Sequence, residues 1–144
     1  MAAWAGHIYL GQFEKSLEYF DKAIRLSPHD PYVSGWYQGE GAGHFALKQY
    51  DQTIEWARRS IAFSQSANPW QHENLIAALA LAGHQAEAHD ALQNYLASVP
   101  NGPKTIAAWK AFAARIISTR NSPRYLEMFD RYYEGLRKAG MPEG

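Results

Sequence analysis

The chain has 144 residues, enough for one domain, and it carries 14 basic and 14 acidic side chains, so its formal net charge is zero. This balance offers no overall attraction to nucleic-acid phosphates or to an anionic membrane surface. The lack of cysteine excludes a disulfide framework and thiolate chemistry, and no apolar run approaches the roughly 20 residues that a membrane-spanning helix needs. We therefore expect a cytoplasmic, single-domain protein with no membrane contact.

One phrase occurs three times along the chain, beginning at Gly11, Lys48 and Gly83, so that the copies are spaced by 37 and 35 residues. A period of this length is typical of a unit of helix, turn and helix. Such a unit cannot bury its apolar face alone and stacks on copies of itself. The repeat therefore predicts a stack of helical hairpins.

The expected hairpins cover about residues 1–28, 31–66 and 69–100. Within the first copy of the phrase, Phe13 and Leu17 begin an apolar stripe at helical spacing, while charged residues occupy the other faces. The second copy repeats this stripe and the third keeps it only in part. Prolines near the boundaries suit first helical turns and would interrupt helix interiors.

Two further helices are expected over about residues 104–119 and 122–140. The first carries apolar residues at helical spacing as far as Ile117, and the second begins at an N-cap, Ser122, and ends at a glycine stop, Gly140. We expect this pair to cap the stack. The predicted fold class is all-α, an α-α superhelix of helical hairpins with a C-terminal capping helix pair.

The phrase has small, aromatic and proline residues at fixed places, among them Ser16, Phe20 and Pro28. This pattern resembles the tetratricopeptide repeat, and the resemblance covers about residues 1–102. It implies a right-handed α-superhelix whose usual work is protein binding. The sequence departs from the family's pattern at three positions: Trp4, Gln65 and Tyr95.

The tail EGLRKAGMPEG, from Glu134, resembles the ending of bacterial repeat regions that follow a class III adenylate or guanylate cyclase domain or a winged-helix regulator. This resemblance implies that the chain is a fragment of a larger protein. The first hairpin also looks truncated, which would leave the apolar face of Phe13, Leu17 and Phe20 partly uncovered. We therefore expect a homodimer through the truncated N-terminal hairpin, with Trp4 near the contact.

In the resembling family, the first helices of the hairpins line a concave groove that binds partners. Carrying this pattern over gives the expected partner groove: Ile8, Tyr9, Gln38, Ala42, Phe45, Trp70, Glu73, Ala77 and Leu81. No lysine or arginine occurs in these helices, so a clamp for an acidic C-terminal tail is not expected, and an apolar or weakly basic partner fits better. For Phe45 and Trp70, packing against neighbouring helices is an equally weighted alternative.

Three glycines, Gly35, Gly39 and Gly43, recur every four residues and form a bare stripe on one helix. Together with Gly41 they sacrifice about 3–4 kcal/mol of helix propensity relative to alanine. Close approach of a neighbouring helix or a bound peptide would explain this cost. A phosphate-binding loop is not expected, because the glycines lie within helical periodicity and follow no strand.

Catalytic and metal-binding patterns are absent from the sequence. The six histidines include no pair four residues apart, and no serine, histidine and carboxylate set has a spacing that predicts a triad. We therefore expect no enzyme, no catalytic residue, no metal and no cofactor.

The predicted function is a non-catalytic protein-protein interaction module, a scaffold of the kind used in signalling, which binds a partner peptide or helix in its groove. The alternative is a regulatory or dimerisation region of a larger bacterial nucleotidyl cyclase or transcription regulator. Residues 104–144 carry eight basic and four acidic side chains, but these fall at helical spacing between aromatic residues. Nucleic acid is therefore not the expected partner.

Overall fold

The computed structural model describes residue 8 and residues 10–66, 68–117 and 121–144, and the statements below concern these residues. They form seven α-helices and no strand, which confirms the all-α fold class. The helices are α2 (Phe13–Leu26), α3 (Val33–Ala46), α4 (Tyr50–Phe63), α5 (Pro69–Leu81), α6 (Gln85–Ser98), α7 (Ile106–Ala113) and α8 (Pro123–Ala139). None of these helices is both long enough and apolar enough to cross a bilayer.

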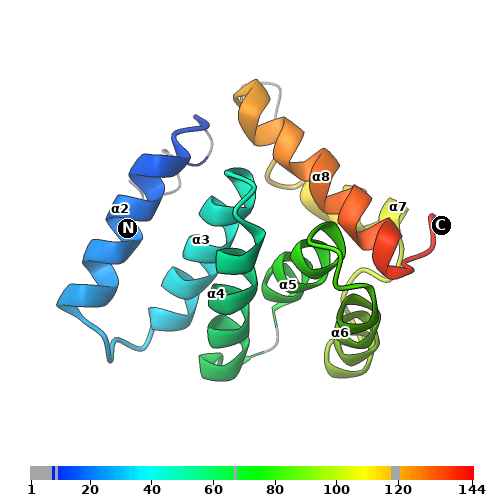
Figure 1. Ribbon diagram of the computed structural model, residues 1–144, viewed down its shortest axis with the longest axis horizontal. Helices are drawn as coiled ribbons and strands as arrows, with labels where there is room; N and C mark the ends of the chain where they lie inside the picture. Colours follow the sequence, from blue (N-terminus) through cyan, green and yellow to red (C-terminus); the bar gives the residue numbers. More distant parts are fainter. Residues whose placement is uncertain (1–7, 9, 67, 118–120) are drawn as a thin grey trace.

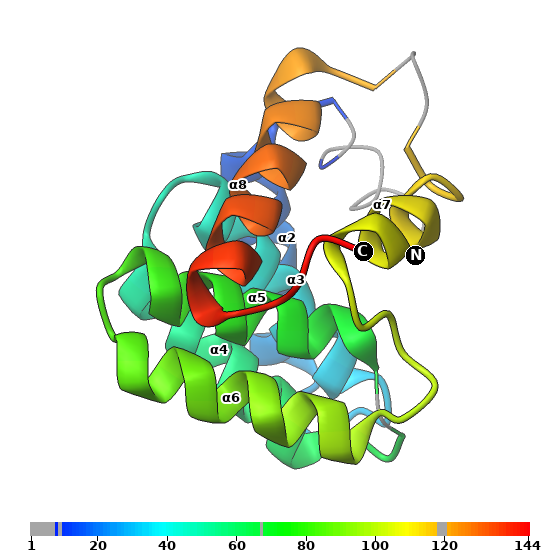
Figure 2. The same cartoon turned by 90° about the vertical axis from the view of Figure 1, so that its right-hand side faces the viewer.

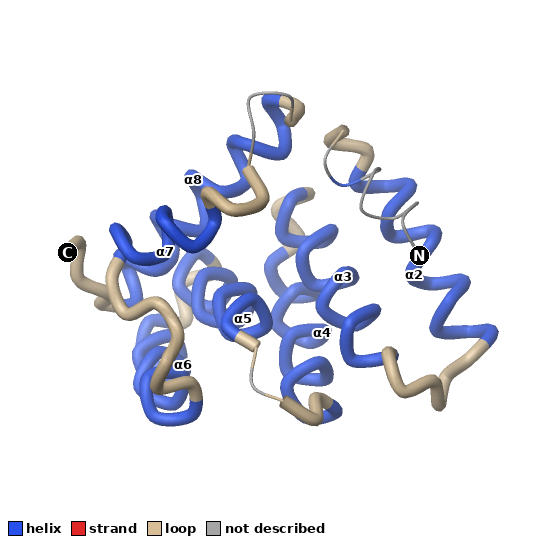
Figure 3. The backbone as a smooth tube through the Cα atoms, turned by 180° about the vertical axis from the view of Figure 1, so that it is seen from behind, coloured by secondary structure: helices blue, strands red, loops and turns tan. Residues whose placement is uncertain are grey.

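Helices α2 to α6 follow one another in space as they do along the chain, from one end of the molecule to the other (Figure 1). Each of them packs against the next, so that α3 contacts α2 and α4, and α5 contacts α4 and α6. The view from behind shows the same order (Figure 3). This arrangement is that of a helical repeat stack.

The register of the three repeats is visible in their burial. Ser16, Thr53 and Ala88 occupy equivalent positions, and each is 0% exposed. The two hydroxyls also make equivalent hydrogen bonds, from Ser16 to the Gln12 carbonyl at 3.3 Å and from Thr53 to the Gln49 carbonyl at 3.1 Å. The alignment of the small residues in the sequence therefore has a physical cause: helices approach closely at these sites.

The turn before α2, α4 and α6 uses one backbone conformation three times. Gly11, Lys48 and Gly83 have φ angles of 74°, 61° and 87°. This left-handed region costs an L residue roughly 1–2 kcal/mol, whereas glycine enters it freely. The second repeat therefore carries a strained residue where the other two have glycine.

Replacing Lys48 with glycine should raise the free energy of unfolding by about 0.5–1 kcal/mol, because relief of the strain exceeds the added entropy of the unfolded chain. The Lys48 side chain is exposed, so no packing is lost. Chemical denaturation measures the effect. Gly83→Ala, which introduces the same strain in the third repeat, should have the opposite effect, and a destabilised Lys48→Gly variant would contradict this account.

Two glycines of α3 let helix α2 approach closely. A Cβ atom on Gly43 would lie 2.7 Å from Leu17 Cδ2, and one on Gly39 would overlap the Phe20 ring. Both contacts are shorter than carbon atoms tolerate, so a larger residue at either position would force the Leu17 or Phe20 side chain of α2 to move. A neighbouring helix, rather than a bound peptide, therefore explains these two positions.

The other two glycines of α3 differ from each other. A Cβ atom on Gly41 would lie 3.3 Å from Asn74 Nδ2, so this position is close-packed against α5. No atom lies within 4 Å of the Cβ position of Gly35. The expectation that Gly35 is a close-packing glycine is therefore wrong, because it lies at an exposed position in the first turn of α3.

Two of the three residues named for the apolar face of α2 are buried. Phe13 and Phe20 are each 1% exposed, and the Arg124 guanidinium of α8 lies 4.9 Å from the centre of the Phe13 ring. The expectation of a partly uncovered face is therefore wrong for Phe13 and Phe20, whereas Leu17 is half-buried. The N-terminal homodimer stays a prediction. Trp4 lies outside the described residues.

Helix α7 is shorter than predicted, ending at Ala113 instead of near residue 119. The N–H groups of Ile116 and Ile117 both donate to the Ala113 carbonyl at 3.0 Å, so the chain closes into a tight turn there. Branched residues such as isoleucine have lower helix propensity, which weakens continuation of the helix.

Helix α8 follows α7, begins near the start of α2 and ends beside α6 (Figure 2). At its start, Arg124 donates to the Gly11 carbonyl at 2.8 Å. In its middle, Arg131 donates to the Phe45 and Ala46 carbonyls at 2.7 and 2.9 Å, which caps the end of α3. Charge-assisted bonds of this kind are among the stronger hydrogen bonds, so α8 ties the first two hairpins to the third.

The C-terminal tail holds α7 in place. The N–H groups of Ile106 and Ala107 donate to the Pro142 and Glu143 carbonyls at 2.9 and 2.8 Å. These are N–H groups of the first turn, which have no partner within their own helix. The tail thus supplies a backbone cap that fixes α7 beside α8.

Candidate functional site

Helix α5 forms the floor of the site, and its start is specified locally. Asn68 is the N-cap, its side chain accepting from the Trp70 N–H at 2.9 Å, and Pro69 occupies the first turn. Trp70 and Glu73, three residues apart, then lie on one face of the helix.

A cavity of about 260 Å³ lies over this face. We call it the central cavity, and its lining residues come from α3, α5, α8, residue 8 and the turn after α7: Ile8, Gln38, Ala42, Trp70, Glu73, Asn74, Ile116, Tyr125, Met128, Phe129 and Tyr132. Five of the predicted groove residues are among them: Ile8, Gln38, Ala42, Trp70 and Glu73. The structure therefore brings together most of the predicted groove.

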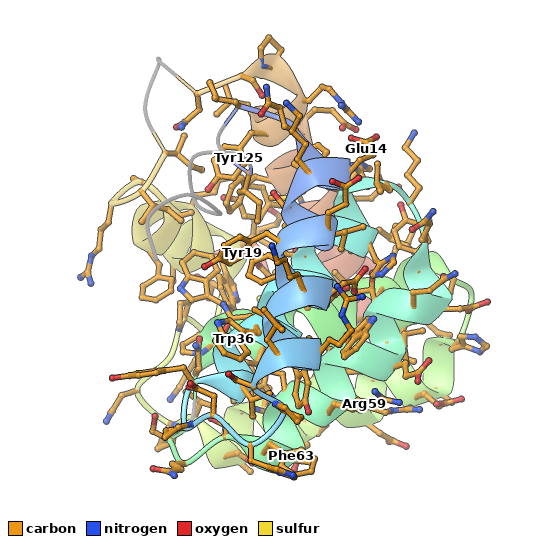
Figure 4. All side chains as sticks on the ribbon, turned by 90° about the vertical axis from the view of Figure 1, so that its left-hand side faces the viewer. Glu14, Tyr19, Trp36, Arg59, Phe63 and Tyr125 are labelled. Carbon is orange, nitrogen blue, oxygen red and sulfur yellow. The ribbon has the colours of Figure 1, made fainter. Side chains whose placement is uncertain are left out.

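Aromatic rings form one wall of the central cavity. Phe129 lies at its middle, with ring centroids 5.2 Å from Tyr125, 5.9 Å from Tyr132 and 6.4 Å from Trp70. Figure 4 shows Tyr125 on the side of α2 that faces α7, the same side as Tyr19 and Trp36. The inner side of the stack is thus rich in aromatic residues.

Two predicted groove residues lie beneath α8 instead of in the cavity. Phe45 is 0% exposed and stacks on Tyr132, with centroids 3.9 Å apart and planes 2° from parallel. Ala77 is also 0% exposed, because α8 approaches it through Gly135. The alternative of packing against a neighbouring helix is therefore confirmed for Phe45. Trp70 also packs against a neighbouring helix, since its ring centroid lies 4.7 Å from that of Phe112 in α7, although Trp70 lines the cavity as well.

Two predicted groove residues remain to be placed, and six residues that line the cavity were not predicted. Leu81 is half-buried at the end of α5 and does not line the cavity, and Tyr9 lies outside the described residues. Sequence reasoning missed the following lining residues: Asn74, Ile116, Tyr125, Met128, Phe129 and Tyr132. The apolar stripe of the last helix was visible in the sequence, but the surface against which it packs was not.

The carboxyl group of Glu73 is buried, and one of its oxygens has no hydrogen-bond donor among the described residues. Its side chain is 1% exposed, and no described residue donates a hydrogen bond to its Oε2. Burial raises the pKa of Glu73 well above its ordinary value. The neighbouring polar groups are engaged elsewhere, since the Tyr132 hydroxyl and the Asn74 side-chain oxygen bond to each other.

Glu40 is a second buried carboxylate, on α3, and it does not line the central cavity. It is 1% exposed, and desolvation raises its pKa to about 7; His44 opposes this shift and Asp21 adds to it. His44 Nε2 lies 3.4 Å from Glu40 Oε2. Burial alone would lower the pKa of His44, but hydrogen bonding to Glu40 and Gln49 outweighs burial and raises it.

A wider cavity of about 390 Å³ lies at the other end of α3, against the connection between α4 and α5. The exposed rings of Tyr32 and Phe63 border it, and its described lining carries no charged side chain. Only Gln38 of the predicted groove reaches it. We therefore regard the central cavity, with its aromatic wall and buried carboxylate, as the candidate site.

In the part of the chain that the structure describes, no group of three or more histidine, aspartate or glutamate residues could hold a metal ion. No family model matches the chain, and comparisons with curated proteins and with solved structures find no significant match.

Proposed function

We propose that the protein is a non-catalytic, cytoplasmic interaction module that binds a partner peptide or helix at the central cavity, as its resemblance to tetratricopeptide repeats implies. One observation carries the proposal: five residues chosen from the repeat pattern line a single cavity together with the aromatic face of α8. Residues from separate elements meet there around a largely apolar cavity, which suits recognition of one large side chain of an apolar or weakly basic partner.

The cavity's charge and shape restrict the partner. No lysine or arginine is among the described lining residues, so an acidic tail finds no counter-charge there. Because α8 covers Phe45 and Ala77, the partner would contact Gln38, Ala42 and Trp70 instead. A short segment with one large anchor fits this space better than a long helix along the whole stack.

Selection from a random peptide library displayed on phage tests the proposal. The wild-type protein should enrich peptides that share one large anchor residue, either apolar or basic with an apolar stem. These peptides should lose binding to Ala42→Arg by about tenfold or more, since the large side chain would occupy the space that the peptide needs.

The matched control is Gln52→Arg, which adds the same side chain at an exposed position of α4. Peptides that bind the wild type and Gln52→Arg but not Ala42→Arg would support the proposal. Failure to enrich any peptide, or equal binding to both variants, would contradict it.

A further inference from the structure

We propose that the central cavity recognises an alkylammonium group, with Glu73 as its counter-charge and the aromatic wall as its lining. The cation could arrive as the lysine side chain of a partner or as a free amine, since the recognising chemistry is the same. This inference rests on the proposed binding role of the cavity and names the chemistry of the ligand.

The first observation is the isolation of Glu73 within an otherwise satisfied polar lining. Gln38 accepts a hydrogen bond from Asn68 at 2.8 Å, and Asn74 is bonded to Tyr132. Glu73 Oε2 remains buried without a donor from any described residue. A buried carboxylate without a partner is costly, and a ligand that brings an N–H donor and a positive charge would remove that cost.

The second observation is the set of rings around this carboxylate. Trp70, Tyr125, Phe129 and Tyr132 all line the cavity that Glu73 lines. Aromatic faces attract cations, and the attraction is greatest in desolvated sites such as this one. Ring faces combined with one carboxylate favour an organic ammonium over a hydrated metal ion, which needs several oxygen ligands.

The ionisable groups recorded as interacting with Glu73 are phenols, which carry no positive charge. Glu73 is faced by the phenols of Tyr95 on α6 and of Tyr132 and Tyr133 on α8, whose pKa values burial raises. Arg131 of α8, which interacts with Tyr132, is held by Glu127 and by the carbonyls at the end of α3. On the α3 side, the cavity wall consists of neutral residues, Gln38 and Ala42.

The size of the cavity limits the ligand. A volume of about 260 Å³ lies slightly below the range typical of drug-sized ligand pockets, about 300–1,000 Å³. A four-carbon stem with a terminal ammonium fits such a space, and the half-exposed side chain of Ile116, at 42% exposure, lies at its edge. For so small a ligand, a dissociation constant on the order of 1 mM is expected.

Titration of the full chain with n-butylamine, followed by the NMR signal of the Trp70 indole, tests the inference. Saturable binding is expected, with 1-butanol, which has the same stem but no charge, weaker by about tenfold or more. Glu73→Gln should lose about the same factor for the amine and leave the alcohol unchanged. Glu55→Gln, at an exposed position of α4, is the matched control and should bind like the wild type.

A second measurement needs no variant. Burial raises the pKa of Glu73 and a bound cation would lower it, so binding of a cation should be linked to proton release. Amine affinity should then rise by up to about tenfold per pH unit below the pKa of Glu73. Calorimetry in two buffers of different ionisation enthalpy counts the protons. Equal binding of amine and alcohol, or equal binding of the amine by the wild type and Glu73→Gln, would overturn the inference.

Two further ligands test whether the cation is the lysine side chain of a partner or a free amine. Acetyl-lysine methylamide carries the ammonium on a peptide backbone, and acetyl-norleucine methylamide is its neutral match. Preference for the lysine compound supports a partner's side chain, whereas binding of n-butylamine alone supports a free amine. If the amine binds but no selected peptide depends on the cavity, the proposed function is contradicted and this inference stands. If peptides bind at the cavity but the amine does not, only this inference is contradicted.

Discussion

Replacement of Gly135 with alanine is expected to lower the free energy of unfolding by about 3 kcal/mol, the upper part of the range for overpacked sites. A Cβ atom there would lie 2.7 Å from Ala77 Cα and 2.8 Å from the Ala77 carbonyl oxygen. Both obstacles are backbone atoms, so no rotamer change relieves them and α8 must move away from α5. The melting temperature should fall by roughly 6–12 °C.

The matched control is Gly35→Ala. No atom lies within 4 Å of the Cβ position of Gly35, so alanine there should be neutral or stabilising, by up to about 1 kcal/mol. Denaturant melts of both variants give the comparison. Equal effects of the two substitutions would show that helix propensity, and not the contact between α5 and α8, governs the result.

The second prediction with a large effect is that Glu40 makes the free energy of unfolding depend on pH. Glu40 has an ordinary pKa of 4.5 in the unfolded chain and about 7 in the folded protein. Folding therefore favours the protonated carboxyl. The contribution of Glu40 to the free energy of unfolding is fully present below pH 4.5 and is lost as the pH rises to about 7. The raised pKa of His44 acts in the same direction, because the folded state also favours protonated His44.

Glu40→Gln should consequently be more stable than the wild type at pH 8, by about 2 kcal/mol. The full shift of the Glu40 pKa corresponds to a somewhat larger free energy. Glu40→Gln also loses the contact with His44, which reduces the gain in stability. The difference should disappear near pH 4.5, where the wild-type carboxyl is protonated as well. Glu18→Gln, at an exposed position of α2, should show no such dependence. A pH-independent difference for Glu40→Gln would contradict the assigned shift.

Much of the stack could be predicted because its determinants are local. The apolar stripes, the small residues at Ser16, Thr53 and Ala88, and the caps at Asn68 and Ser122 each act within a few residues of the chain. The same local pattern placed Gln38, Ala42, Trp70 and Glu73 on the inner faces of their helices, where the structure finds them lining one cavity.

The remainder of the site depends on contacts that no periodicity contains. The stripe of Tyr125, Phe129 and Tyr132 showed that the last helix packs against something, but an apolar face fits any apolar surface of similar shape. Its actual partner is set by pairs such as Asn74 with Tyr132, 58 residues apart, and Phe45 with Arg131, 86 residues apart. These pairs are invisible in a single sequence.

The sequence by itself therefore determined the repeat, the helical hairpins and the inner face of the stack, because spacing and caps act along the chain. Only the tertiary structure decided that α8 crosses back over α5, covers Phe45 and Ala77, and encloses the cavity beside Glu73. Side-chain shape and close backbone approach, as at Gly135, select one docking site among several apolar faces. The burial that isolates the Glu73 carboxylate arises from that same docking.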